Sequence, residues 1–296
     1  MASDRIKEAA SVRELFAWGA DFLKAHGIEN PKRNAEQLLG HLLDLDRFNL
    51  YLSEHQTLDL RQRSDYEALL EKRASNIPLQ YLTGRSAFLE NEFAVDPRVL
   101  IPRPETEFLT EEARRRLAAV KHPFVIDIGT GCGNIAVILA KTLKAKVWAT
   151  DVSAEALEVA RLNAGRLGAA NRITFVQGDL LQPLKGIGLE GKIDLVISNP
   201  PYIRRTEFAT LPSEVRLHEP RVALDGGEDG LVVYRKLIPE AGAFLKEGGF
   251  LILEMGDGMS REIATLVASQ GLFGRIELLQ DLAGRERILI TRRKGS

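Results

Sequence analysis

The stretch FVIDIGTGCG, residues 124–133, decides the fold. Its first half, FVIDI, is apolar apart from Asp127 and is typical of a buried strand. Gly129, Gly131 and Gly133 follow at once, before a helix expected over 135–143. Because glycine allows a sharp turn and lets a ligand approach the main chain, the stretch predicts a strand, a turn and a helix with a candidate ligand site at the turn. A purely structural turn is the alternative.

Outward from this stretch, predicted strands and helices alternate through residues 105–296. Such alternation is typical of a doubly wound α/β sheet with mostly parallel strands. Residues 280–286 are too few for a helical crossover between the last two strands, so these are expected to pair antiparallel. The seven expected strands are 124–128, 146–149, 173–177, 193–198, 250–253, 276–279 and 287–290, and the expected helices are 105–119, 135–143, 154–167, 231–244 and 260–268.

Residues 1–76 carry helical patterns alone. Ser11 and Glu14 have capping-box spacing at the start of one amphipathic helix, and Asn30 before Pro31 predicts the N-cap of a second. We therefore expect a small all-α helical bundle over 1–76. Prolines punctuate 77–104, which is interpreted as a hairpin-like linker, and 105–296 is interpreted as the α/β domain.

The composition excludes several classes of protein. In 296 residues, 40 Lys and Arg face 41 Asp and Glu, so the net charge of -1 provides no basic field for nucleic acid. Cys132 is the single cysteine and the five histidines are scattered, which argues against a disulfide and a metal site. The charged start MASDRIKEAA is unlike a signal peptide, and no run of 18 apolar residues occurs. We expect a cytoplasmic protein that binds neither a metal nor a membrane.

Acidic residues follow the second and third predicted strands. Asp151 stands where a carboxylate accepts hydrogen bonds from ribose hydroxyls, with capping of the next helix as the alternative. Asp179 is placed to accept from an adenine amino group while Leu180 packs on the ring. The third glycine of the turn, Gly133, comes one position too early for a dinucleotide fingerprint, which disfavours a pyrophosphate site. Together these residues predict a nucleoside pocket.

The fourth predicted strand ends in Asn199-Pro200-Pro201-Tyr202, the most informative tetrapeptide in the chain. Prolines that end a strand explain Pro200 and Pro201 alone. Because proline fixes the backbone, the Asn199 side-chain oxygen and the Pro200 carbonyl form a rigid pair of acceptors. A planar NH₂ group that donates to both would lie against the Tyr202 ring.

In this order, DIGTGCG, Asp151, Asp179 and NPPY resemble the class I S-adenosylmethionine-dependent methyltransferases that act on planar amide or amine nitrogen. The fuller set of motifs resembles the PrmC/HemK family of peptide-chain release factor glutamine N5-methyltransferases. Within it, Cys132 replaces a common Ser or Thr and Leu180 a frequent aromatic residue. The motifs are PLQYLTG (78–84), DPRVLIPRPETE (96–107), NPPYI (199–203), EPRVAL (219–224), GGEDGL (226–231) and DLAGRER (281–287).

The resemblance implies a Rossmann-like methyltransferase sheet that binds S-adenosyl-L-methionine and releases S-adenosyl-L-homocysteine. The substrate would be the glutamine of the Gly-Gly-Gln motif in class 1 release factors, recognised with help from the helical domain over 1–76. The implied catalytic residues are Asn199, Pro200 and Tyr202, the implied substrate-binding residues add Pro201, and the implied cofactor-binding residues are Gly129, Thr130, Gly131, Cys132, Gly133, Asp151, Asp179, Leu180 and Asn199.

Residues 204–230 form a long stretch with at most short helical pieces, directly after NPPY. Loops of this length inside compact domains are usually functional, so we expect it to cover the substrate glutamine or to contact the partner protein. Two other functions stay open. One is an adenine-N6 methyltransferase acting on DNA or RNA, because an exocyclic amine meets NPPY in the same way. The other is a non-catalytic binding module.

Overall fold

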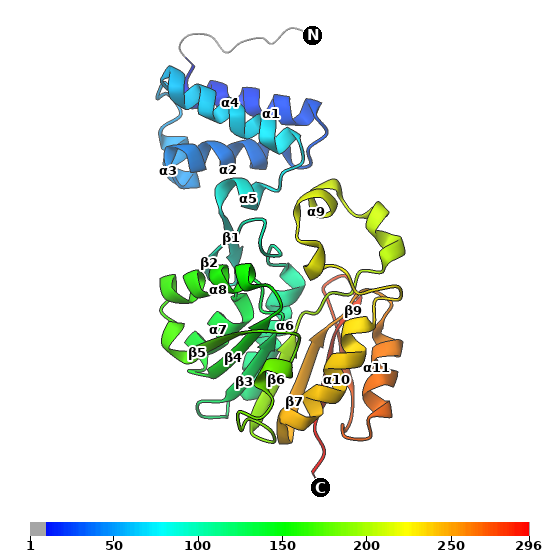
Figure 1. Ribbon diagram of the computed structural model, residues 1–296. Helices are drawn as coiled ribbons and strands as arrows, with labels where there is room; N and C mark the ends of the chain where they lie inside the picture. The colour runs from blue at the N-terminus through cyan, green and yellow to red at the C-terminus, as the bar shows by residue number, and fades with distance from the viewer. Residues whose placement is uncertain (1–9, 296) are drawn as a thin grey trace. The chain divides into compact units, whose positions relative to one another are not determined.

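The computed structural model describes residues 10–295, so most of the charged start of the chain lies outside the described residues (Figure 1). The chain forms two compact units. One comprises the described residues up to Arg85 together with Pro212–His218, and the other comprises Ser86–Leu211 and the residues from Glu219 onward. None of the helices within 10–295 combines the length and the apolar character that crossing a membrane requires.

The first unit is all-α. Leu15, Leu38 and Tyr66 are among the completely buried side chains of its core. Helices α1 and α4 approach closely at Gly19, where a Cβ would lie 2.3 Å from the Tyr66 hydroxyl. The helices are α1 (Val12–Ala25), α2 (Pro31–Leu43), α3 (Arg47–Leu52), α4 (Leu60–Ala74), α5 (Leu79–Thr83) and, from much later in the chain, α9 (Ser213–His218).

Two helix starts in this unit test the sequence reasoning. The capping box of Ser11 and Glu14 at α1 is confirmed. At α2, the prediction of Asn30 as the N-cap and of Pro31 in the first turn is confirmed. Asn30 adopts a left-handed conformation with φ of 51°, and its side chain makes no cap hydrogen bond. Its backbone carbonyl instead accepts from the Asn34 side chain at 3.1 Å.

Arg73 holds α9 within the helical unit. Its guanidinium donates to the Asn34 side chain at 2.7 Å and to the Ile77 carbonyl at 3.1 Å. It also forms an ion pair with Glu214 of α9 at 2.8 Å. Since Arg73 is itself buried, this pair is less screened by solvent than a surface pair. The Pro212–His218 segment is therefore anchored to the helical unit.

The second unit contains a seven-stranded sheet in the order β5-β4-β3-β6-β7-β9-β8, and a separate pair, β1-β2. Strands β3 to β7 are parallel, whereas β9 runs antiparallel to both neighbours, β7 and β8. The predicted fold class and the antiparallel final strand are confirmed. The strands are β1 (Arg85–Phe88), β2 (Asn91–Ala94), β3 (Phe124–Ile128), β4 (Lys146–Asp151), β5 (Ile173–Gln177), β6 (Ile193–Ser198), β7 (Leu245–Glu254), β8 (Glu277–Gln280) and β9 (Glu286–Arg292).

Helices cover both faces of this sheet (Figure 1). Helices α6 and α10 both pack against β6 and β7, and every residue of β6 is buried. A strand buried on both faces is apolar nearly throughout, which explains the sequence IDLVIS. The helices of this unit are α6 (Pro104–Leu117), α7 (Asn134–Thr142), α8 (Ala154–Arg166), α10 (Val232–Phe244) and α11 (Ser260–Ser269).

The sequence prediction placed the start of β7 too late, at residue 250 rather than Leu245. Its first part, LKEGG, is largely exposed and contains two glycines, so it lacks the apolar pattern of a buried strand. The pairing with β6 is irregular there, between Ile193 and Leu195. The regular part of β7 begins at Phe250, opposite Leu195.

Candidate active site

A cavity of about 300 Å³ lies at the carboxyl ends of β3, β4, β5 and β6. The chain lays down β3, β4 and β5 outward and then returns to place β6 on the other side of β3. Ligands bind at such a switch point because the connections diverge there and leave a crevice. The strand ends contribute Ile128, Gly129, Gly131, Thr150, Asp151, Val152, Gly178, Asp179, Leu180, Asn199 and Pro201 to the lining.

The glycine turn after β3 offers space, and most of its N–H groups are engaged. The backbone N–H groups of Gly129 and Thr130 both donate to the Thr150 carbonyl, and that of Gly133 donates to the Thr130 carbonyl. Gly129 and Gly131 have φ of +69° and +55°, and a Cβ built on either meets no atom within 4 Å. A phosphate cradle needs unengaged N–H groups, so this turn does not form one. It suits a ligand that fills the space without phosphate.

Asp151 stabilises the turn from the end of β4. One carboxylate oxygen accepts from the Gly131 N–H at 2.9 Å and the other from the Ser153 N–H at 2.9 Å. Each oxygen retains accepting capacity, because a carboxylate has about four lone-pair sites. Burial raises the pKa of Asp151, and hydrogen bonds from backbone N–H groups oppose that shift. The site thus combines a carboxylate with hydrogen bonds that favour its ionised form.

Asp179 lies further out, at the end of β5. Its side chain is more than half exposed and lies 3.4 Å from the Lys236 Nζ. Leu180 follows with a positive φ of 51° and packs against the core of the sheet. Both residues line the cavity. Because Asp179 is well solvated, a hydrogen bond from a ligand to its carboxylate would compete with water more than one to Asp151.

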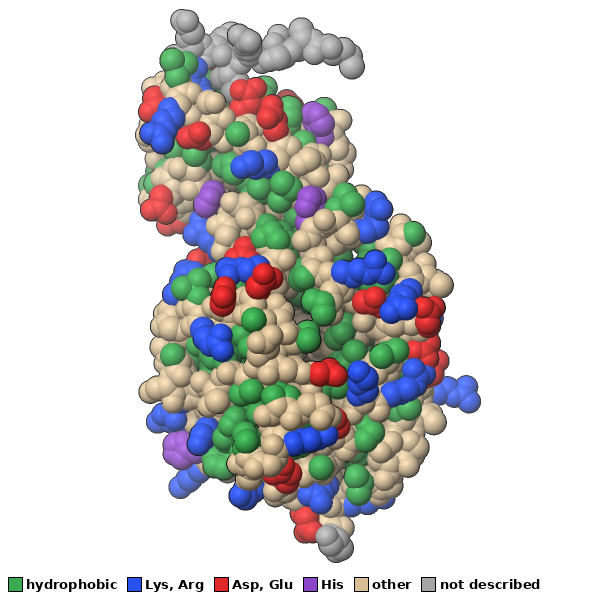
Figure 2. All heavy atoms as spheres, viewed as in Figure 1, with side chains coloured by type: hydrophobic (Ala, Val, Ile, Leu, Met, Phe, Trp, Pro, Cys, Tyr) green, Lys and Arg blue, Asp and Glu red, His purple; other side chains and the backbone are tan. Residues whose placement is uncertain are grey.

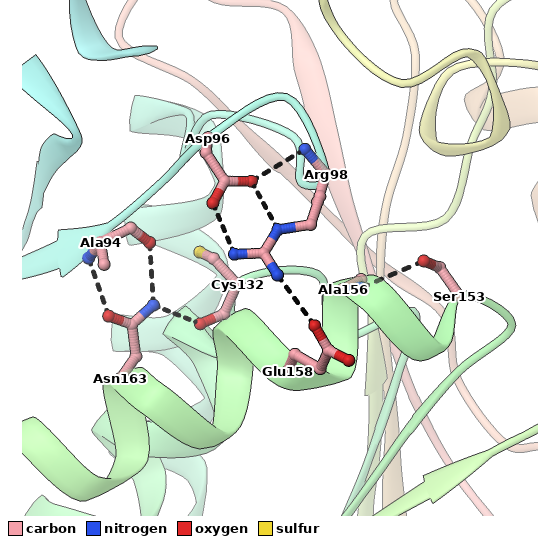
Figure 3. A network of polar contacts seen from close by, with 8 residues as sticks. All are labelled: Ala94, Asp96, Arg98, Cys132, Ser153, Ala156, Glu158 and Asn163. Carbon is pink, nitrogen blue, oxygen red and sulfur yellow. Dashed lines mark hydrogen bonds and ion pairs between the residues drawn. The ribbon is translucent and has the colours of Figure 1, made fainter. Parts of the chain in front are cut away.

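A buried asparagine ties the glycine turn to the strand pair β1-β2 (Figure 3). The Asn163 amide of α8 donates to the Cys132 carbonyl at 2.9 Å and to the Ala94 carbonyl at 2.9 Å, and its oxygen accepts from the Ala94 N–H at 2.7 Å. The Cys132 side chain is buried outside the cavity lining, and burial raises the pKa of its thiol to about 12. The glycine turn is thus held by Asn163 on one side and by Asp151 on the other.

The NPPY turn after β6 presents Asn199 to the cavity. The Asn199 Nδ2 donates to the Thr106 hydroxyl at 3.0 Å, which leaves Oδ1 available to accept. Pro201 also lines the cavity, whereas Pro200 is buried. The Tyr202 side chain is half-buried and packs against the core of the sheet.

Three glycines allow close packing around Tyr202. A Cβ on Gly226 would lie 2.7 Å from the Tyr202 Cα, and one on Gly230 would lie 2.6 Å from its carbonyl oxygen. A Cβ on Gly256 would lie 3.0 Å from the ring. Ile203 also bridges to Asp225 in parallel. The GGEDGL segment is therefore glycine-rich because it lies directly against the backbone of the NPPY turn.

Sequence reasoning assigned no role to several residues that the structure brings to the cavity. Arg98 is one; Asp96 pairs with its guanidinium at 2.7 Å and Glu158 at 2.9 Å (Figure 3). Its motif was recognised, but nothing in the order of the chain places it at the sheet. Of the predicted cofactor and acceptor residues, those outside the lining are Thr130, Cys132, Gly133, Pro200 and Tyr202. The stretch 204–230, which was expected to cover the substrate or contact the partner, contributes Pro220, Val222, Ala223 and Asp225, and the lining residues without a predicted role are Arg98, Val99, Leu100, Ile128, Thr150, Val152, Ser153, Ala156, Gly178 and Val233.

Comparisons with known proteins agree with this geometry. Residues 14–84 match the PrmC N-terminal domain, and residues 106–237 match the methyltransferase small domain. The chain is 42% identical over 285 residues to a release factor glutamine methyltransferase of Moorella thermoacetica, covering 96% of this chain and 99% of that protein. It is 41% identical to the protein of the same name from Chlorobaculum tepidum, covering 92% and 93%.

Among solved structures, a methyltransferase from Pyrococcus furiosus shares the fold, with a TM-score of 0.51, 20% identity and coverage of 78% of this chain and all of that one. The curated relatives carry the stronger evidence, because their identity extends over both units. This chain belongs to the release factor glutamine methyltransferase family and is a methyltransferase.

Proposed function

We propose that this protein transfers a methyl group from S-adenosyl-L-methionine to the side-chain amide nitrogen, N5, of the glutamine in the Gly-Gly-Gln motif of class 1 release factors. The observation that carries the proposal is Asn199 at the edge of the cavity, with its Nδ2 engaged by Thr106 and its Oδ1 available. A side-chain oxygen held in this way suits recognition of an amide N–H in the acceptor.

The residues of the cavity fit the cofactor. Gly129 and Gly131 leave room where a Cβ would project, and Asp151 and Asp179 supply carboxylates for ribose and adenine groups. Because the N–H groups of Gly129, Thr130, Gly131 and Gly133 are engaged, the cavity suits a sulfonium nucleoside better than a pyrophosphate. When bound, the cofactor supplies an activated methyl group on a positive sulfonium.

The role of the NPPY turn is to orient the acceptor. The lone pair of an amide nitrogen is delocalised into its carbonyl, so the nitrogen is a poor nucleophile and catalysis depends on positioning. Asn199 Oδ1 and the Pro200 carbonyl would accept the two N–H donors of the glutamine amide, with the Tyr202 ring beside it. We further propose that the helical unit contributes to recognition of the release factor. The segment 220–225, which lines the cavity, would cover the bound glutamine.

Mass spectrometry tests the proposal directly. The purified protein is incubated with S-adenosyl-L-methionine and a class 1 release factor, and the Gly-Gly-Gln peptide is then examined. We expect one added methyl group on the glutamine and none when that glutamine is replaced by glutamate in the factor. Duplex DNA and RNA serve as competing acceptors, and methylation of adenine in either with an unmodified release factor would overturn the proposal.

Net charge supports a protein acceptor over a nucleic acid. The chain carries a formal net charge of -1, and Figure 2 shows acidic and basic side chains mixed over the visible face. Non-specific binding to nucleic acid rests largely on basic surfaces that displace counterions from phosphates. A mixed surface provides little of this attraction.

A further inference from the structure

Two buried side chains stand behind Asn199 and do not line the cavity. Thr106, in the first turn of α6, accepts from the Asn199 Nδ2 at 3.0 Å and donates to the Glu254 Oε2 at 2.7 Å. Thr106 is 3% exposed and Glu254 is 1% exposed. The three residues thus form a chain of hydrogen bonds that runs from the core of the sheet to the edge of the cavity.

The fold brings these three residues together from distant parts of the sequence. Ser198 on β6 pairs with Leu253 on β7, so Asn199 and Glu254 occupy the next positions on neighbouring strands. Helix α6 packs against both strands, and its first turn brings the Thr106 hydroxyl within hydrogen-bond distance of Glu254 at the end of β7. The Tyr234 hydroxyl donates to the Glu254 carbonyl oxygen at 2.6 Å, which anchors the end of β7.

The chemistry of the groups gives this chain of hydrogen bonds a direction. An ionised carboxylate only accepts, so the one hydroxyl hydrogen of Thr106 is committed to Glu254. The Thr106 oxygen can then only accept, and the carboxamide of Asn199 must turn its Nδ2 toward it. The Oδ1 of Asn199 is consequently directed away from Thr106.

We propose that Thr106 and Glu254 are positioning residues that hold the Asn199 carboxamide with its oxygen toward the acceptor amide. The inference rests on the proposed function, since it concerns how the acceptor is oriented. It adds two residues that act through Asn199. A flipped carboxamide would present an NH₂ group to the NH₂ group of the acceptor, and donor would face donor.

The ionisation of Glu254 makes the arrangement sensitive to pH. Burial raises the pKa of Glu254 to about 7, while the Thr106 hydrogen bond opposes that shift. Of the charged groups around it, Glu105 raises the pKa further and Arg287 and Arg103 lower it. Two phenols, of Tyr202 and Tyr234, also face the carboxylate, and neither ionises near neutral pH.

Protonated Glu254 is able to donate to Thr106, which releases the Thr106 hydroxyl hydrogen toward Asn199. Both carboxamide orientations are then permitted. The fraction of correctly oriented Asn199 therefore falls as the pH drops through the pKa of Glu254.

Substitution of Thr106 tests the positioning role. Thr106→Val keeps the shape and removes the hydroxyl, and we expect kcat for release-factor methylation to fall at least about 30-fold. Thr106→Ser restores the hydroxyl and is expected to stay within about threefold of the wild type. Cofactor affinity by calorimetry should change less than about threefold in both variants, because Thr106 does not line the cavity.

Thr110→Val is a matched control. Thr110 is completely buried one turn further along α6, and its hydroxyl donates only to the Thr106 carbonyl oxygen at 2.8 Å. Loss of a similar buried hydroxyl there should leave kcat within about threefold of the wild type. Equal kcat values for Thr106→Val and the wild type would overturn the inference, as would equal losses in Thr106→Val and Thr110→Val.

Glu254→Gln provides a readout that does not depend on the folding of the Thr106 variant. Glutamine is able to donate or accept, so the direction of the hydrogen bonds is lost at every pH. We expect kcat at pH 8 to fall about tenfold and the decline of kcat below about pH 7 to disappear. Retention of that decline in Glu254→Gln would overturn the role of Glu254.

Different results would overturn the proposed function and the positioning role of Thr106 and Glu254. A wild-type protein that leaves every class 1 release factor unmethylated defeats the proposed function and this inference with it. Wild-type and Thr106→Ser activity accompanied by equal activity of Thr106→Val defeats the positioning role alone.

Discussion

The turns after β3 and β6 follow neighbouring strands of the sheet, and they offer a ligand different things. The glycine turn donates the N–H groups of Gly129, Thr130 and Gly131 to the end of β4 and contributes empty space, whereas the NPPY turn fixes a polar side chain through Thr106. In the proposed function, the first would therefore accommodate the cofactor by its shape, and the second would direct hydrogen bonds to the acceptor. Substitutions in the two turns should separate cofactor binding from methyl transfer.

Asn199→Ala should have the largest effect. It removes the acceptor that would orient the glutamine amide, and loss of one oriented transition-state partner costs about 100- to 1000-fold in kcat. Single-turnover methylation of a release factor at saturating cofactor measures the rate and separates it from any change in cofactor affinity. Full methylation by this variant would exclude Asn199 from the reaction.

Gly226→Ala should have the second largest effect, because the added Cβ would displace the backbone of the NPPY turn. Its Cβ would lie 2.7 Å from the Tyr202 Cα, closer than real Cβ atoms approach, so the backbone of the turn must shift. A displacement of about 1 Å at a reacting group lowers the rate about 100-fold. Gly165→Ala in α8 is the comparison, since Gly165 has helical backbone and a Cβ there meets no atom within 4 Å. Comparable kcat values in the two variants would contradict the expectation.

Gly131→Ala should show the reverse pattern, with cofactor affinity lost first. Its φ of +55° is strained for alanine, and the added Cβ would project into the cavity. We expect the dissociation constant of the cofactor to rise about 10- to 30-fold, since strain and lost space together amount to about 1.4 to 2 kcal/mol. With saturating cofactor, kcat should recover to within about threefold of the wild type. A kcat defect that persists at saturating cofactor would mean that the glycine turn also acts on methyl transfer, and the two turns would then not have separate roles.

Asp179→Ala should have the smallest effect. The carboxylate is more than half exposed, so its hydrogen bond to the cofactor would compete with water. We expect about a fivefold loss of cofactor affinity, in keeping with the modest energies of solvated charged groups. Asp151→Ala gives the contrast, because it also removes the support of the Gly131 N–H. A larger loss from Asp179→Ala than from Asp151→Ala would reverse this ranking.

The alternating part of the chain was predictable because buried parallel strands leave an unmistakable apolar pattern. The strand FVIDI and the helix after its glycine turn were predicted to within one residue at each end. The exposed start of β7 was missed because its pattern is polar and glycine-rich. Asn30 is the N-cap of α2 as predicted, but its left-handed conformation was not predicted, because Asn favours both side-chain capping and left-handed backbone and sequence does not separate the two.

Individual residues of the site were predictable where they follow strands. Asp151, Asp179 and Asn199 all do so, and all three line the cavity. Glu254 also ends a strand, and the same rule applied to β7 would have singled it out. Thr106 and Arg98 come from segments before the first strand of the main sheet, so their place at the strand ends depends on tertiary packing.

The membership of Pro212–His218 in the helical unit bears on how the family diversifies. The chain leaves the methyltransferase unit, pairs Glu214 with Arg73, and returns with Glu219, whose carboxylate accepts from the Ile101 N–H at 3.2 Å. A chimera that exchanged the N-terminal helices alone would place Pro212–His218 against the helices of another protein. Recombination between relatives should therefore succeed only when both pieces are inherited together.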